Sequence, residues 1–125
     1  MLHHTLLITA AIFLILWGIG HLLPTRAIVG GFKNISRDNK YIITMTWLCE
    51  GLLLIYIGIM LILIMLFADI FNPVAILFYR SSAVLLIILS IVTLLTGART
   101  PVLPIKICPV VKTFCAILLI LASLL

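Results

Sequence analysis

Three ionisable side chains interrupt long apolar stretches of this chain: His21, Glu50 and Lys112. Because a charge is expensive to bury in apolar surroundings, such residues are the first candidates for function. An imidazole, a carboxylate and an amine can together handle a proton or hold a polar or anionic headgroup. The simpler interpretation, which the sequence favours, is an ion pair between Glu50 and Lys112 that ties two helices together.

Arg80 is a fourth ionisable residue within an apolar stretch. It shares a helical face with Ser90 and other small residues, which would let a neighbouring helix approach closely. We expect Arg80 and the adjacent Tyr79 to extend toward the nearer membrane surface. An ion pair with Asp69 and an approach to Glu50 are the alternatives.

The cysteines give no sign of a disulfide or of redox chemistry. Cys49, Cys108 and Cys115 form no CxxC pair. On one helix, Cys108 and Cys115 would share a face but lie about 10 Å apart along the axis, which is beyond the reach of a disulfide. We interpret them as ordinary buried thiols.

The sequence predicts no metal site and no cofactor. His3 and His4 lie about 25 Å along a helix from His21, and no thiol–imidazole spacing typical of zinc occurs. His21 alone makes a poor case for a haem ligand. The chain also lacks HExxH, a phosphate-binding glycine loop, a Ser/His/Asp arrangement and paired carboxylates, which disfavours an enzyme.

The composition indicates the environment in which these residues lie. Of 125 residues, 66% are hydrophobic and 9% are charged, and the mean hydropathy is +1.47. A soluble domain has about 25% charged residues, so most of this surface must face lipid. The eight Lys and Arg are scattered between apolar runs, which argues against a nucleic-acid partner and for membrane lipids.

Four apolar runs are long enough to cross a bilayer, which takes about 20 residues. Since lipid offers no hydrogen bonds to the backbone, the runs should be helices. We predict an all-α, integral membrane four-helix bundle with up-down topology and short loops, formed as a single transmembrane domain over 1–125. Its helices should span approximately 4–23, 41–67, 73–97 and 105–125.

The basic residues predict the orientation. They cluster in the first and third loops, which the positive-inside rule places in the cytoplasm, with both termini outside. Two tryptophans fall near the same helix ends, as expected for an aromatic belt. The predicted interface residues are Trp17, Trp47, Arg26, Lys33, Arg37, Lys40, Arg99 and Lys106. The expected location is the bacterial cytoplasmic (inner) membrane.

This topology places His21, Glu50 and Lys112 in the same, cytoplasmic half of the bundle. Thr93 and Thr96 of the third span fall at a similar depth. The five side chains can therefore form one polar cluster that faces inward. Whether they converge decides between the functional hypotheses.

Two stretches resemble a known family. Residues 21 to 51 read HLLPTRAIVGGFKNISRDNKYIITMTWLCEG, and residues 97 to 112 read GARTPVLPIKICPVVK. They are similar to a family of small four-span bacterial membrane proteins without an assigned activity, and the chain has the size of DoxX-type four-helix proteins. The resemblance implies four helices, with the distinctive residues in the cytoplasmic loops and adjoining helix ends.

We weigh three functions. The leading hypothesis is a non-enzymatic subunit of a homo-oligomer or a larger membrane complex, because the chain offers apolar faces, small-residue patches and almost no soluble part. The alternative is a transporter or binder of a small hydrophobic, quinone-like or lipid-like ligand, which requires His21, Glu50 and Lys112 to converge on a cavity. An enzyme using Glu50 and His21 as acid and base is third.

Overall fold

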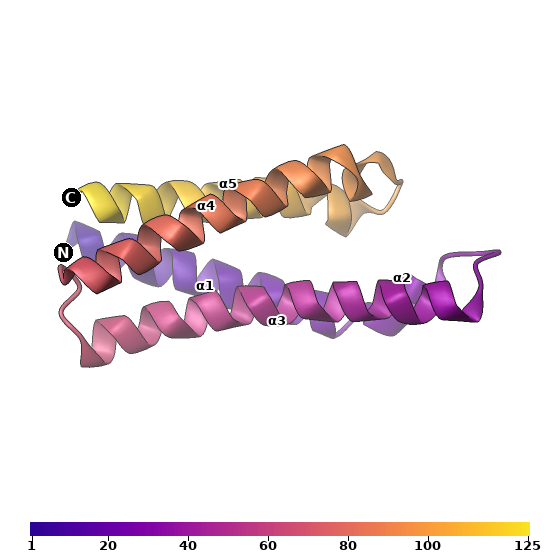
Figure 1. Cartoon of the computed structure of the whole chain (residues 1–125), viewed down its shortest axis with the longest axis horizontal. Coiled ribbons are helices and arrows are strands. Elements are labelled where there is room, and N and C mark those ends of the chain that lie inside the picture. The colour runs from indigo at the N-terminus through magenta and orange to yellow at the C-terminus, as the bar shows by residue number, and fades with distance from the viewer.

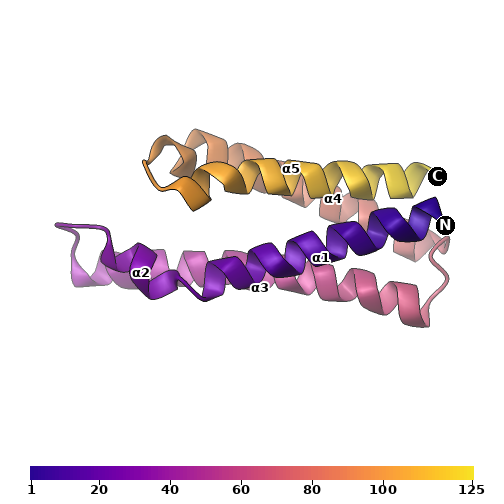
Figure 2. The same cartoon turned by 180° about the vertical axis from the view of Figure 1, so that it is seen from behind.

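The computed structural model describes all 125 residues and is built from helices (Figure 1). Its elements are α1 (Leu2–Leu22), α2 (Thr25–Gly30), α3 (Arg37–Phe67), α4 (Pro73–Leu95), η1 (Gly97–Arg99) and α5 (Leu103–Leu124). The four long helices run up and down, and both termini lie at one end of the bundle (Figures 1 and 2). The predicted fold class is confirmed.

Local hydrogen bonds explain where two helices begin. Helix α3 starts earlier than the predicted boundary at 41, because the Ser36 side chain caps it by accepting a hydrogen bond from the Asn39 N–H at 3.1 Å. Helix α4 starts at the predicted residue. Asn72 accepts from the Val74 N–H at 2.9 Å, and Pro73 occupies the first turn, where its missing N–H costs nothing.

The helices pack as two pairs that meet through α1. Helix α1 packs closely along α3, α4 packs along α5, and α1 also contacts α5. Glycines allow the close approach in the first pair: a Cβ placed on Gly18 would lie 2.6 Å from the Gly51 carbonyl oxygen, and one on Gly58 would lie 2.9 Å from that of Ala11. The small residues of α1 and α3 are therefore used within the chain.

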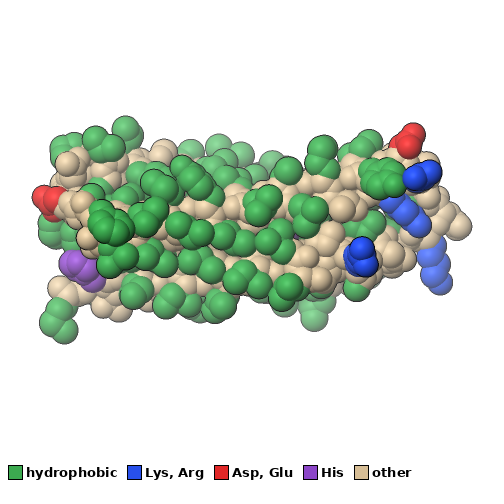
Figure 3. Space-filling model, turned by 90° about the horizontal axis from the view of Figure 1, so that it is seen from below, with side chains coloured by type: hydrophobic (Ala, Val, Ile, Leu, Met, Phe, Trp, Pro, Cys, Tyr) green, Lys and Arg blue, Asp and Glu red, His purple; other side chains and the backbone are tan.

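The surface suits a lipid environment. Helices α1, α3, α5 and the segment Pro73–Arg99 are each long and apolar enough to span a membrane. Figure 3 shows hydrophobic side chains along the length of the bundle and Lys and Arg side chains gathered at the end away from the termini. The chain is a small integral membrane protein with four candidate spans.

Candidate functional site

A buried ion pair lies at the centre of the polar cluster. The Lys112 side chain of α5 is fully buried, and its ammonium group pairs with Glu50 Oε1 of α3. It also donates a hydrogen bond to Thr93 Oγ1 of α4 at 2.9 Å. Helices α3, α4 and α5, which belong to both helix pairs, therefore meet at the Lys112 ammonium group. Thr96, the other threonine considered from sequence, instead donates to the Val92 carbonyl of its own helix.

The pair is not sealed on all sides. The Glu50 side chain is 26% exposed, whereas that of Lys112 is 0% exposed. A buried ammonium is tolerated only while it is paired and hydrogen-bonded, so Lys112 depends on Glu50 and Thr93. The carboxylate, in turn, is the part of the pair that a molecule outside the bundle can reach.

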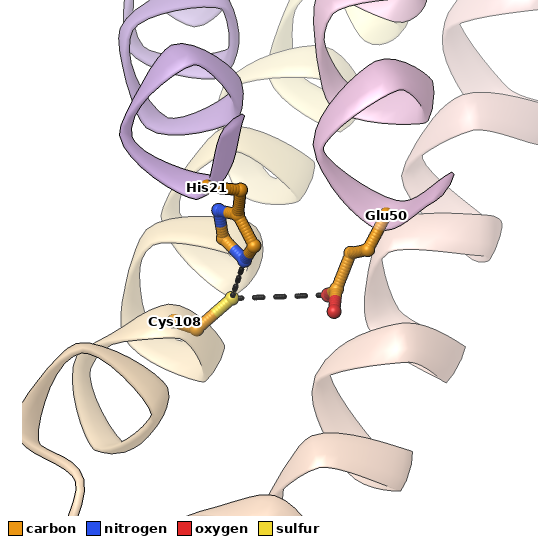
Figure 4. A group of neighbouring side chains, drawn as sticks. All are labelled: His21, Glu50 and Cys108. Carbon is orange, nitrogen blue, oxygen red and sulfur yellow. Dashed lines mark hydrogen bonds between the residues drawn. The ribbon is translucent and has the colours of Figure 1, made fainter. Parts of the chain in front are cut away.

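His21 of α1 points into the same cluster (Figure 4). Its Nδ1 lies 2.9 Å from the Trp17 carbonyl oxygen. A carbonyl can only accept, so Nδ1 carries a proton and Nε2 is the ring nitrogen directed at the sulfur. Nε2 lies 3.7 Å from Cys108 Sγ of α5.

Cys108 is the member of the cluster that sequence reasoning missed. Its buried Sγ lies 3.8 Å from Glu50 Oε1, to which the thiol can donate, and it accepts a hydrogen bond from the Trp17 indole N–H at 3.2 Å. Cys108 is a buried free thiol, as expected, but its contacts with Trp17, His21 and Glu50 were not predicted. The sequence could have placed Cys108 in the cluster, because it lies one helical turn before Lys112 and both side chains therefore share one helix face.

A cavity of about 260 Å³ adjoins the cluster. It is lined by Trp17, Gly20, His21, Trp47 and the first turns of α5 at Leu103, Pro104 and Ile107. The Trp47 indole donates to the His21 carbonyl, and the His21 and Trp47 rings lie 4.7 Å apart at a 31° tilt. His21 therefore has one side toward the cavity and its Nε2 toward Cys108.

Arg80 lies outside the cluster, toward the end of the bundle that holds the termini. It donates to Ser123 Oγ at 3.3 Å and to the Ser123 carbonyl at 3.2 Å, near the end of α5. The expectation that Tyr79 extends to the membrane surface was wrong, because its side chain is fully buried and donates to the Ile70 carbonyl at 3.3 Å. Arg80 thus ties α4 to α5 and does not approach Glu50.

The predicted interface residues divide into two groups. Trp17 and Trp47 contribute to the cavity wall and hydrogen-bond inward. The basic residues of the first and third connections, Arg26, Lys33, Arg37, Lys40, Arg99 and Lys106, take no part in the ion pair and lie in or beside α2, α3, η1 and the start of α5.

The fold and the site define a four-helix integral membrane protein with an amine, a carboxylate, an imidazole and a thiol packed together beside an aromatic cavity. The chain matches no protein-family model, no curated protein sequence and no solved structure. Its relation to the small four-span bacterial proteins that it resembles stays a prediction.

Proposed function

We propose that this protein binds a small amphiphilic ligand with a planar, quinone-like ring at the end of the bundle away from the termini. The observation that carries the proposal is the convergence of His21, Glu50 and Lys112 from three helices beside a cavity. The ligand-binding hypothesis required the three side chains to converge on a cavity; they converge, and His21 is the one of them that lines the cavity.

The cavity wall suits a flat ring with one polar edge. Trp17, His21 and Trp47 offer aromatic faces, which pack well on planar ligands, and the remaining lining residues are small or apolar. Ligand pockets usually measure about 300–1,000 Å³. A cavity just below that range fits a single ring system, with any aliphatic tail left along the lipid-facing surface.

The polar edge of such a ligand would meet His21. Beyond the imidazole lie Cys108 and the Glu50–Lys112 pair, which form a connected set of donors and acceptors. A ligand carbonyl or hydroxyl placed at this wall can exchange hydrogen bonds with groups that are already oriented, so little ordering is needed on binding.

The packing of the small residues weakens the rival proposal, a subunit of a homo-oligomer or larger complex. The subunit hypothesis rested in part on small-residue patches, and the small residues Gly18, Gly51 and Gly58 make their close contacts within the chain. The subunit hypothesis and the inner-membrane location stay predictions. The basic residues gathered at the end opposite the termini support the predicted orientation, with that end in the cytoplasm (Figure 3).

Intrinsic fluorescence offers a direct test of ligand binding. The two tryptophans of the chain, Trp17 and Trp47, both line the cavity. We expect menadione, a naphthoquinone without an aliphatic tail, to quench the tryptophan fluorescence of the purified, detergent-solubilised protein with a saturable curve. Quenching that rises linearly with menadione concentration, and that is the same in the cavity variant described below, would refute the proposal.

Two glycine variants provide the comparison. A Cβ on Gly20 or on Gly30 meets no atom within 4 Å, so neither replacement should disturb the fold. Gly20 lines the cavity and Gly30 does not. We expect Gly20→Leu to fill the cavity and weaken binding at least tenfold, while Gly30→Leu binds as the unmodified chain does.

A further inference from the structure

Three atoms that can ligate a metal come together in the cluster. His21 Nε2, Cys108 Sγ and Glu50 Oε1, from α1, α5 and α3, all lie within 4.8 Å of one another (Figure 4). The sulfur is 3.7 Å from the nitrogen and 3.8 Å from the oxygen. Ligands about 2.0–2.3 Å from one tetrahedral ion are separated by roughly 3.5 Å. Both distances from the sulfur are within a few tenths of an ångström of that separation, and the nitrogen and oxygen lie no more than 4.8 Å apart.

His21 and Cys108 already have hydrogen bonds of the kind that orient ligands in metal sites. A metal-bound imidazole normally donates its other N–H to a carbonyl or carboxylate, which fixes the free nitrogen toward the ion. Here the Trp17 carbonyl accepts from His21 Nδ1, and the Trp17 indole N–H donates to Cys108 Sγ. One residue thus orients the imidazole and would stabilise negative charge on the sulfur.

Lys112 determines which charge the site can accept. With Glu50 ionised, Lys112 protonated and the thiol neutral, the cluster carries no net charge. A monovalent ion that replaces the thiol proton keeps it neutral, because one positive charge leaves and one arrives. A divalent ion leaves one uncompensated positive charge in surroundings of low dielectric constant, where such a charge is costly.

We propose that His21, Cys108 and Glu50 bind one thiophilic metal ion, and that the charge of Lys112 makes Cu⁺ the preferred ion over Zn²⁺. Thiolate and imidazole are both suitable ligands for copper. Binding forms an S–Cu bond, and the thiol proton is released to water. The partly exposed Glu50 side chain is the ligand that an entering ion can meet first. The inference does not depend on the proposed quinone ligand.

Metal titration of the full-length protein tests this site without any quinone present. Exposed Cys49 is first replaced by serine to remove a competing thiol. Cu⁺, kept reduced with ascorbate, is then partitioned between the protein and the coloured chelator bicinchoninate, and Zn²⁺ is titrated separately. We expect one Cu⁺ per chain, with one proton released per ion, and weaker binding of Zn²⁺.

The two buried cysteines supply a matched pair of variants. Cys108 and Cys115 lie on the same helix and are almost completely buried. Cys108→Ser should weaken Cu⁺ binding by more than the ~10–100-fold that loss of an outer-shell partner costs, whereas Cys115→Ser should not change it. Equal affinity in both variants would overturn the site.

Two further measurements keep the inference falsifiable if Cys108→Ser folds poorly. X-ray absorption of the Cu⁺-loaded Cys49→Ser protein should show one sulfur and one imidazole scatterer, and a spectrum without sulfur overturns the site. Lys112→Met, which removes the positive charge, should shift the preference from Cu⁺ toward Zn²⁺. Tighter binding of Zn²⁺ by the protein with Lys112 intact would overturn the choice of a monovalent ion.

Discussion

Replacing Glu50 with glutamine tests whether the ion pair supports the fold. The substitution keeps the shape of the side chain and an acceptor oxygen at Oε1, but it removes the negative charge and leaves the buried Lys112 ammonium without a counter-ion. Removing one member of a buried pair costs about 3–5 kcal/mol. Because the Glu50 side chain is 26% exposed, the bundle does not fully enclose the pair, and we expect the lower end, ~3 kcal/mol.

The free energy of unfolding can be measured by reversible denaturation in mixed micelles. The double variant Glu50→Gln/Lys112→Met should recover part of this loss, since it leaves no unpaired charge inside the bundle. The double-mutant cycle should therefore show a coupling of ~2–3 kcal/mol. Additive effects, or a loss below ~0.5 kcal/mol for Glu50→Gln, would refute the claim that the two groups are paired inside the bundle.

Three further predictions concern other parts of the molecule. Gly18→Leu should separate α1 from α3 and lower the unfolding temperature sharply, because its Cβ would lie 2.6 Å from the Gly51 carbonyl oxygen; an unchanged transition would contradict the packing. Arg80→Met should cost ~1–2 kcal/mol through its lost hydrogen bonds to the end of α5 and leave quinone and copper affinities unchanged; altered affinity would connect it to the site. Cysteines introduced for Arg37 and Arg99 should react with an impermeant maleimide from the same side of the membrane, and labelling from opposite sides would refute the topology.

The span count could be predicted from the sequence because it depends on the length and hydropathy of each run alone. The ion pair between Glu50 and Lys112 could also be predicted, because the topology places both residues in the same half of the bundle. The start of α3 was placed too late, because the Ser36 cap acts in a polar stretch that hydropathy does not resolve.

The thiol could not be assigned in the same way. Cys108 has its partners Trp17, His21 and Glu50 on two other helices, so no local spacing marks them as a group. The cavity depends on how the Trp47 indole turns toward the end of α1, which is a property of packing. Arg80 also needed the structure, because its partner at the end of α5 is distant in sequence.

Carbodiimide coupling tests the central claim, that α3 and α5 meet at a carboxylate and an amine, most directly. Dicyclohexylcarbodiimide partitions into membranes and joins an adjacent carboxylate and amine as an amide with loss of one water. Mass spectrometry of the digested protein should find Glu50 joined to Lys112, and Lys112→Met should abolish this product. A Glu50 linked instead to the loop lysines Lys33 or Lys40, or left without any amine partner, would contradict the site.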